Sequence, residues 1–296
     1  MPLAWLLVVS LVNDVRTLIA RHDLPAAEQA ARTYQAQSGA TPELAAALSW
    51  IARGALDARQ LDPADAYAAE SRKLAVELLR TRTLAADPWL STALGASIEV
   101  HAQVLAARGE RSEAVSFLRD QLGAWGTAPI AERIRKNLNL LSLEGKTAPP
   151  LEAREWVGAG RTTLAALRGH PVLLFFWAHW CPDCKSMAPM LRSLMKTYGP
   201  RGLTLVAPTR LYGFAAGGEE AAPPVEKQYI ERVRQQYYPA LADTPIPLSA
   251  ADFLAYGAST TPTIVLIDAS GIVRFYHPGA LSEAELSGRI RKLLGN

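Results

Sequence analysis

Two kinds of hydrophobic pattern divide the chain. From about residue 10 to residue 145, apolar positions recur at helical spacing in segments dominated by alanine, leucine, arginine and glutamate. Short breaks containing glycine, proline or aspartate interrupt the pattern and leave predicted helices of about 12 to 20 residues. Asp23, Thr41, Asp62 and Asp87 lie at such breaks, where short polar side chains cap helix N-termini. The pattern predicts an all-α domain over residues 10–145.

Small residues within this domain indicate paired helices. Ala102, Gly109 and Ala114 fall where two antiparallel helices would touch, a spacing that resembles a tetratricopeptide repeat, although most of the large signature residues are missing. We therefore predict an array of helical hairpins with a tetratricopeptide-like character. Such an array offers a concave surface to a protein partner, or it is a helical extension that packs against the second domain.

The pattern changes after a polar stretch that ends in Pro149-Pro150. Adjacent prolines end a helix and favour extended backbone, so we predict that a second domain spans residues 149–296. The predicted strands are 156–157, 163–164, 172–177, 203–207, 246–248, 263–267 and 272–276, and the predicted helices are 185–195, 225–238, 251–256 and 283–294. Residues 208–224 are predicted to form a long loop.

The N-terminus begins with an apolar run, Leu3–Val9, which we interpret as part of a shortened signal segment over residues 1–9. No Lys or Arg precedes the run, so the alternative is the first turn of a folded helix. The signal interpretation predicts a periplasmic or secreted protein, and a cytoplasmic location stays open. Because no run approaches the roughly 20 apolar residues of a membrane span, we expect no integral anchor.

The amino-acid composition and charge argue against some classes of function. The chain is 49% hydrophobic and 20% charged, which is ordinary for a globular protein, and its net charge of +3 is spread without a basic tract. Nucleic acid is therefore not an expected partner. The only two cysteines, Cys181 and Cys184, cannot form a disulfide scaffold, but a C-x-x-C pair next to strand–helix patterning is typical of redox chemistry.

The cysteine pair lies where a buried strand turns into a helix, in the sequence Trp180-Cys181-Pro182-Asp183-Cys184. The free N–H groups and the positive dipole end of a helix start stabilise a thiolate. This turn is therefore the strongest candidate for the functional site.

The motif resembles the active site of the thioredoxin fold once Thr261-Pro262 is added, which opens a strand about 80 residues later. More narrowly, residues from about 148 onward resemble the TlpA/ResA-like extracytoplasmic thiol–disulfide oxidoreductases. The resemblance implies an α/β thioredoxin-like domain with a central mixed sheet flanked by helices. It also implies a cis proline at Pro262 that lies beside the cysteines and supports the substrate backbone.

The resemblance further implies that the two cysteines have different roles in the reaction. Cys181 is the exposed nucleophile that attacks a substrate disulfide, and the more buried Cys184 resolves the mixed disulfide. Pro182 suits the first helical position because its missing N–H would have no partner there. Trp180 shields one side of the thiol and offers an apolar docking surface. The implied partners are disulfide-bearing proteins and a thiol electron donor, with no cofactor other than the Cys181–Cys184 disulfide and no metal.

Two departures from the family pattern affect proton transfer and redox direction. Thioredoxins carry a buried aspartate six positions before the first cysteine, where this chain has Phe175, so the base is water, Glu219, Glu220 or no specific group. Asp183 disfavours a nearby thiolate, against the helix dipole, and this favours a reductase over an oxidase. His179 and Lys185 are candidates to offset that carboxylate.

Three other functions stay open at this point. His179-x-Cys181-x-x-Cys184 offers one nitrogen and two sulfurs to copper or zinc, as a metal chaperone would, but no further ligand completes a tetrahedral shell. The more ordinary expectation for His179 is an exposed side chain beside the motif. A peroxidase would need an isolated peroxidatic cysteine. A non-catalytic scaffold is the third alternative.

Three aromatic side chains are candidates for the rim of the site, with core packing as the ordinary alternative for each. They are Tyr212, Phe214 and His277.

Overall fold

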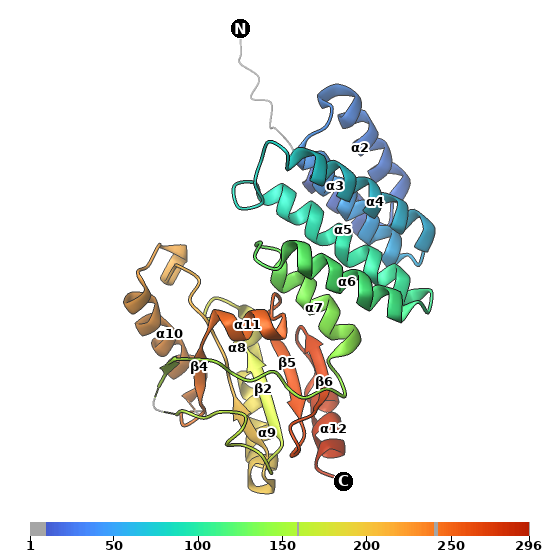
Figure 1. Cartoon of the computed structure of the whole chain (residues 1–296). Helices are drawn as coiled ribbons and strands as arrows, with labels where there is room; N and C mark the ends of the chain where they lie inside the picture. Colours follow the sequence, from blue (N-terminus) through green and yellow to red (C-terminus); the bar gives the residue numbers. More distant parts are fainter. Residues whose placement is uncertain (1–9, 159, 240–241, 296) are drawn as a thin grey trace. The chain divides into compact units, whose positions relative to one another are not determined.

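The helical pattern of the first half forms helices α1 to α7 (Figure 1). Their bounds are α1 Leu11–Ala20, α2 Leu24–Ser38, α3 Pro42–Asp57, α4 Leu61–Leu78, α5 Pro88–Ala107, α6 Arg111–Trp125 and α7 Ala131–Ser142. The computed structural model describes residues 10–158, 160–239 and 242–295, so the predicted signal segment 1–9 lies outside the described residues. Among those described, no helix combines the length and apolar character that a membrane crossing requires.

Three of the four predicted N-caps are confirmed. The side chains of Asp23, Thr41 and Asp87 accept backbone N–H groups in the first turns of α2, α3 and α5. The prediction for Asp62 is wrong, because α4 already begins at Leu61 and Asp62 lies in its first turn. A carboxylate there still interacts favourably with the helix dipole.

Small side chains let the helices of the first half approach closely. Each of α1 to α6 contacts its sequence neighbour, and α1 contacts α3 as α3 contacts α5. Most buried positions of α3, α4 and α5 carry alanine, serine or glycine, among them Ala45, Ala52, Ala64, Ala68 and Ala93. The helical-hairpin prediction fits this packing, while the tetratricopeptide likeness stays a prediction.

The chain divides within α7 into one unit up to Asn137 and a second from Leu138. The second unit contains strands β1 Glu155–Val157, β2 Val172–Phe176, β3 Thr204–Val206, β4 Ile246–Leu248, β5 Thr263–Ile267 and β6 Val273–Pro278. Its helices are α8 Pro182–Ser186, α9 Ala188–Tyr198, α10 Pro223–Tyr237, α11 Ala250–Tyr256 and α12 Glu283–Leu293, with short 3₁₀ turns η1 Gly199–Arg201 and η2 Ala216–Gly218.

Strand β2 lies inside a four-stranded mixed sheet. The strand order is β3-β2-β5-β6, in which β2 pairs parallel with β3 and antiparallel with β5, and β5 pairs antiparallel with β6. Strands β1 and β4 form a separate antiparallel pair, and a parallel bridge between Thr209 and Leu248 links β4 to the chain beyond β3. This confirms the predicted mixed sheet.

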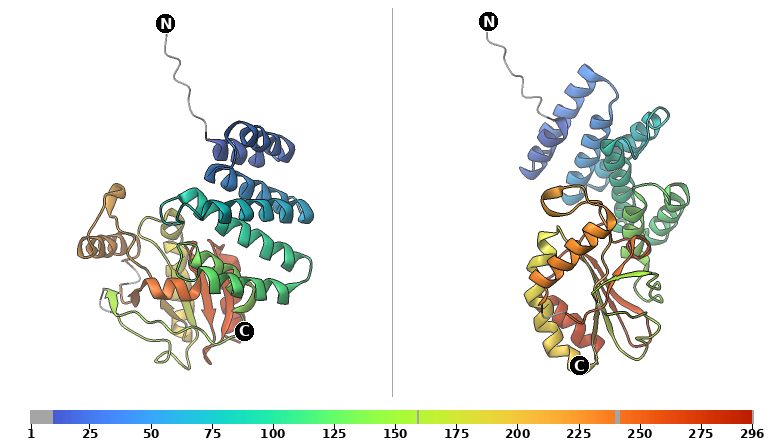
Figure 2. Two further views of the ribbon diagram at one scale, coloured as in Figure 1. Left: turned by 45° about the horizontal axis from the view of Figure 1, so that its top comes forward. Right: turned by 90° about the vertical axis from the view of Figure 1, so that its left-hand side faces the viewer.

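Both faces of the sheet are covered, which explains the uninterrupted apolar sequence of β2. Leu173 and Phe175 face a core that includes α9, α10 and α12. Leu174 and Phe176 face a second core that includes Phe253 of α11. The right-hand view of Figure 2 shows α9, in yellow, and α12, in dark red, on the same side of the sheet. The two layers of helices confirm the α/β prediction for this unit.

Two local predictions are wrong. Residues 163–164 are not a strand, because the chain runs through turns from 164 to 169. The helix after the cysteines is not continuous, because α8 ends at Ser186 and α9 begins at Ala188. Pro189 in the first turn of α9 has no N–H to donate, so it cannot continue the hydrogen bonds of α8.

Candidate active site

The cysteines lie at the turn between β2 and α8. Cys181 is the N-cap of α8, and Pro182 occupies the first helical position, as the sequence predicted. The backbone N–H of Cys184 donates to Cys181 Sγ at 3.1 Å. A helix start therefore directs at least one N–H at the sulfur, and this interaction strengthens when that sulfur carries negative charge.

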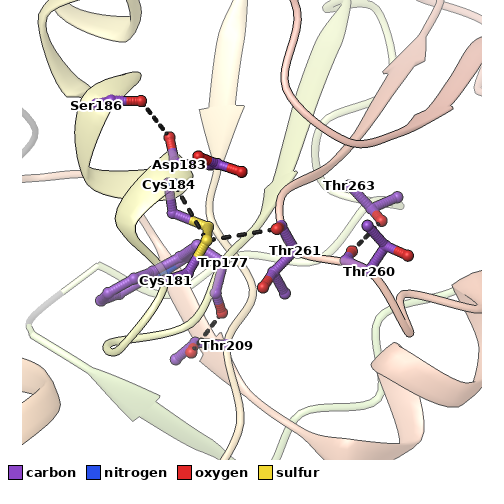
Figure 3. Close-up of a disulfide and its surroundings, with 9 residues drawn as sticks. All are labelled: Trp177, Cys181, Asp183, Cys184, Ser186, Thr209, Thr260, Thr261 and Thr263. Atoms are coloured by element: carbon purple, nitrogen blue, oxygen red, sulfur yellow. Dashed lines mark hydrogen bonds between the residues drawn. A yellow bond between two sulfur atoms is a disulfide. The ribbon is translucent and has the colours of Figure 1, made fainter. Parts of the chain in front are cut away.

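Cys181 and Cys184 form a disulfide, with their Cα atoms 5.3 Å apart (Figure 3). The prediction that Cys181 is exposed is wrong for this state, because only 2% of the residue is accessible. The chain around Thr261 covers it, since the carbonyl oxygen of Thr261 lies 3.4 Å from Cys181 Sγ. Cys184 is fully buried.

The segment that opens β5 reaches the disulfide from a distant part of the sequence. The Thr261–Pro262 peptide bond is cis, and Pro262 is buried. The Thr263 hydroxyl donates to the Thr260 carbonyl at 2.6 Å, and the Gly279 N–H donates to the Pro262 carbonyl at 2.7 Å. The sequence thus identified a segment that lies next to Cys181, and these bonds hold its backbone in place.

The two tryptophans of the turn occupy different environments. Trp177 is buried, its Nε1–H donates to the Ala207 carbonyl, and its own carbonyl accepts from the Thr209 hydroxyl. Trp180 is 47% exposed although it directly precedes Cys181. An exposed indole next to the disulfide is available to contact another molecule.

The prediction that His179 is exposed is wrong. Its side chain is 0% exposed, and its Nε2 lies 3.1 Å from Oε1 of Glu226, which is also 0% exposed. Burial lowers the pKa of His179 and the nearby Lys185 acts in the same direction, while Glu226 opposes them. The imidazole is therefore neutral around pH 7.

Glu226 was missed at the sequence level, where Glu219 and Glu220 were the acidic candidates. Both of those residues are exposed, so neither is a buried acid. Glu226 precedes the buried Ile230 by four positions and the buried Val233 by seven, which puts it on the inner face of α10. A carboxylate at an apolar helical position was the signal that could have revealed it.

Aromatic rings surround His179. The rings of Tyr212, Phe214 and Tyr229 meet the imidazole edge to face, with centroids 5.3 to 5.6 Å apart. Tyr212 also meets the Trp180 ring at 5.5 Å. Two of the three proposed rim residues thus pack beside the site, whereas His277 stacks on Phe275.

The remaining charged candidates lie at the surface of the turn. Asp183 is exposed in the first turn of α8, and Lys185 places its ammonium 4.9 Å from the centre of the Tyr237 ring. In the described part of the chain, no three His, Cys, Asp or Glu side chains gather as metal ligands would. The alternative metal site, with one histidine nitrogen and two sulfurs, is not assembled, because the His179 Nε2 contacts Glu226 and the sulfurs bond each other.

Known proteins resemble the second unit. Residues 145–276 match the AhpC/TSA family. The thiol:disulfide interchange protein DsbE of Xylella fastidiosa is 29% identical over 159 residues, 52% of this chain and 71% of that protein. The thioredoxin-like protein YneN of Bacillus subtilis is 29% identical over 153 residues, 50% of this chain and 78% of that protein. The structure of a DsbE homologue from Chlorobium tepidum covers 51% of this chain and 98% of its own, with 23% identity and a TM-score of 0.41.

Proposed function

We propose that this chain is a protein thiol–disulfide oxidoreductase that acts as a disulfide reductase, since residues 145–276 match the AhpC/TSA family. The observation that carries the proposal is the Cys181–Cys184 disulfide at the start of α8, beside the segment with Pro262. The similarity to DsbE and YneN supports the same activity.

In the proposed reaction, the reduced protein begins with a thiolate at Cys181. The thiolate attacks one sulfur of a substrate disulfide, and the other substrate sulfur leaves as a thiol after taking up a proton. The Cys184 thiol then loses its proton and attacks Cys181 Sγ, which releases the second substrate thiol. The enzyme ends as the Cys181–Cys184 disulfide, and an external dithiol must supply two electrons to reduce it again.

Each supporting residue has a defined place in this scheme. The Cys184 N–H stabilises the Cys181 thiolate, and the backbone at Thr261–Pro262 borders the position where a substrate sulfur would bind. Trp180 provides the exposed apolar surface. Phe175 lies in the same core cluster as the cysteines and has no ionisable group, so it cannot accept the proton of Cys184.

The reducing direction rests on Asp183. An exposed carboxylate in the first turn of α8 disfavours a thiolate at Cys181, and a less stable thiolate makes the disulfide harder to reduce. A midpoint potential near or above about −120 mV, the strongly oxidising end of the range, would contradict this direction. We further propose an extracytoplasmic location, which fractionation of cells that express the full chain tests directly.

Insulin reduction by dithiothreitol tests the activity. The wild-type protein should accelerate precipitation of the insulin chains, and Cys181→Ser should be no faster than dithiothreitol alone. Cys184→Ser should accumulate a mixed disulfide with protein substrates, which a non-reducing gel detects. A wild-type protein no faster than Cys181→Ser would reject the proposal and favour a scaffold without catalytic activity.

A further inference from the structure

The proposed reaction leaves one buried polar group near the active site unused. Glu226 lies inside the second unit, and its carboxylate accepts the Tyr212 N–H at 2.6 Å, the Gly213 N–H at 2.8 Å and the His179 Nε2–H at 3.1 Å. Three donors from two separate segments converge on one carboxylate. The carboxylate oxygens therefore have hydrogen-bond donors from the protein, although the side chain is removed from solvent.

The contacts of Glu226 join three parts of the fold. His179 belongs to the turn before Cys181, Tyr212 and Gly213 belong to the loop after β3, and Glu226 belongs to α10. Gly213 has a φ of +86°, which side chains other than glycine rarely adopt. With Gly213 in this conformation, the successive N–H groups of Tyr212 and Gly213 both donate to the Glu226 carboxylate.

Stability alone does not explain such a pair. Removing a carboxylate from water costs several kcal/mol, and hydrogen bonds to a neutral imidazole and two backbone N–H groups repay only part of that cost. His179 Nδ1 also has no hydrogen-bond partner among the described residues, which adds a further cost. A costly buried pair one residue away from Trp180 therefore calls for a role in the site.

The pair is hydrogen-bonded to both segments that bring the Trp180 and Tyr212 rings together. His179 is bonded to Glu226, and the next residue, Trp180, packs against Tyr212, whose own N–H is bonded to the same carboxylate. The two rings together form an apolar wall directly before Cys181. A protein disulfide that reaches Cys181 must place its flanking polypeptide on the surface that adjoins this sulfur, and the wall is part of that surface.

We propose that His179 and Glu226 are positioning residues that hold Tyr212 against Trp180, so that this wall binds an apolar stretch of polypeptide beside the substrate disulfide. The inference rests on the proposed oxidoreductase function and deepens it. It predicts that the pair affects protein substrates, which use the wall, and leaves small disulfides unaffected.

The test compares two substrates on the full-length protein. Insulin reports on a polypeptide substrate, and hydroxyethyl disulfide reports on the sulfurs alone. Glu226→Gln puts an amide N–H₂ where N–H donors point, and His179→Leu removes the donor to Glu226. Both should raise KM for insulin about tenfold, the equivalent of one lost hydrogen bond to a charged group, with the rate on hydroxyethyl disulfide unchanged.

Two further variants separate positioning from a general loss of structure. His179→Gln keeps an N–H that can reach Glu226 and should restore a KM within about twofold of wild type, because the donor is retained. Tyr198→Phe removes a distant hydrogen bond to Ser287, which lies on α12, and should leave both substrates unaffected. Tyr212→Ala removes one ring of the wall and keeps the backbone N–H that donates to Glu226, and it should also raise KM for insulin alone.

The outcomes are distinguishable. An equal loss on both substrates in Glu226→Gln and Tyr212→Ala, or no change on insulin, would overturn the positioning role. A wild-type protein inactive on both substrates would reject the oxidoreductase function and this inference with it.

Discussion

The two units fill their interiors with different side chains. In the helical unit, α3 alone buries Ala45, Ala46 and Ala47, and the axes can approach closely because these side chains are small. Helices α1 and α3 approach closely at Gly54, where an added Cβ would lie 2.9 Å from Cγ2 of Ile19. In the second unit, aromatic rings on both faces of the sheet fill the space between layers.

The units also differ in how they accommodate charge. In the helical unit, ion pairs join neighbouring helices with part of each side chain in solvent, as for Arg32 and Glu70. In the second unit, His179 and Glu226 are withdrawn from solvent completely. The helical unit thus keeps its ion pairs partly in solvent at modest cost, while the second unit buries a carboxylate at high cost close to its cysteine pair.

Truncating an aromatic core residue should have the largest effect on stability. Phe176 is fully buried, and its ring centroid lies 5.3 Å from that of Phe253 and 5.0 Å from that of Tyr256. Phe176→Ala should lower the free energy of unfolding of the second unit by about 3–5 kcal/mol, because it leaves a cavity between layers. Hydrogen exchange should show lost protection in this unit and unchanged protection in α1 to α6. A loss below about 1 kcal/mol would contradict the tight packing.

The corresponding change in the helical unit is to enlarge a residue. Ala52 of α3 is fully buried in a cluster with Ala64 and Val100. Ala52→Leu should cost about 1–3 kcal/mol, because the helices must separate to accept three more carbon atoms. Ala66→Leu on the exposed face of α4 is the matched control and should change stability by less than about 0.5 kcal/mol. Urea denaturation measures both, and equal effects would show that the alanine contacts are loose.

The buried histidine makes stability depend on pH. The folded-state pKa of His179 is lowered by burial, so the unfolded chain binds the proton more tightly. Its contribution to stability is complete above the unfolded pKa of about 6.5 and is lost as the pH falls, with a slope of at most about 1.4 kcal/mol per pH unit. His179→Gln should remove this part of the slope below pH 6.5, as measured by thermal unfolding at a series of pH values.

Asp252 provides a control, because its effect on stability should change with pH in the opposite direction to that of His179. This buried carboxyl accepts the Glu152 N–H through Oδ1, Oδ2 has no partner among the described residues, and burial raises its pKa. The stabilising contribution of Asp252 is complete below the pKa that it has in the unfolded chain, and it is lost as the pH rises through its pKa in the folded protein. Asp252→Asn should therefore remove a loss of stability with rising pH. The same change of slope in both variants would contradict the two assignments.

Local patterns predicted most of the fold because each element carries its own signal. The apolar run of β2 and the proline before β5 led to the correct central strands, and three aspartate or threonine caps marked helix starts correctly. The break at Met187 and the early start of α4 were missed. Both depend on one or two hydrogen bonds at a helix end, which periodicity does not resolve.

The candidate site was only partly predictable for a different reason. Cys181, Cys184 and Pro262 are recognisable by spacing, whereas His179 and Glu226 meet across 47 positions of sequence. Burial of His179 is produced by Tyr212, Phe214 and Tyr229, which reach it through the loop after β3 and through α10. Tertiary contacts of this kind leave no local pattern, so the sequence suggested an exposed side chain.

The smallest effect is expected from the exposed ion pair, and it tests the contrast in charge directly. Arg32 bonds Glu70 through two parallel contacts of 2.5 and 2.8 Å, yet the two side chains stay 39% and 34% exposed. A double-mutant cycle with Arg32→Ala and Glu70→Ala should give a coupling of about 0.2–1 kcal/mol, because water screens the pair. The coupling should also shrink as salt is added.

A second double-mutant cycle, with His179→Leu and Glu226→Gln, should give a larger coupling energy that is nearly independent of salt, since solvent does not reach that pair. Equal coupling energies with equal salt dependence in the two cycles would contradict the view that burial makes the His179–Glu226 interaction stronger than the Arg32–Glu70 interaction.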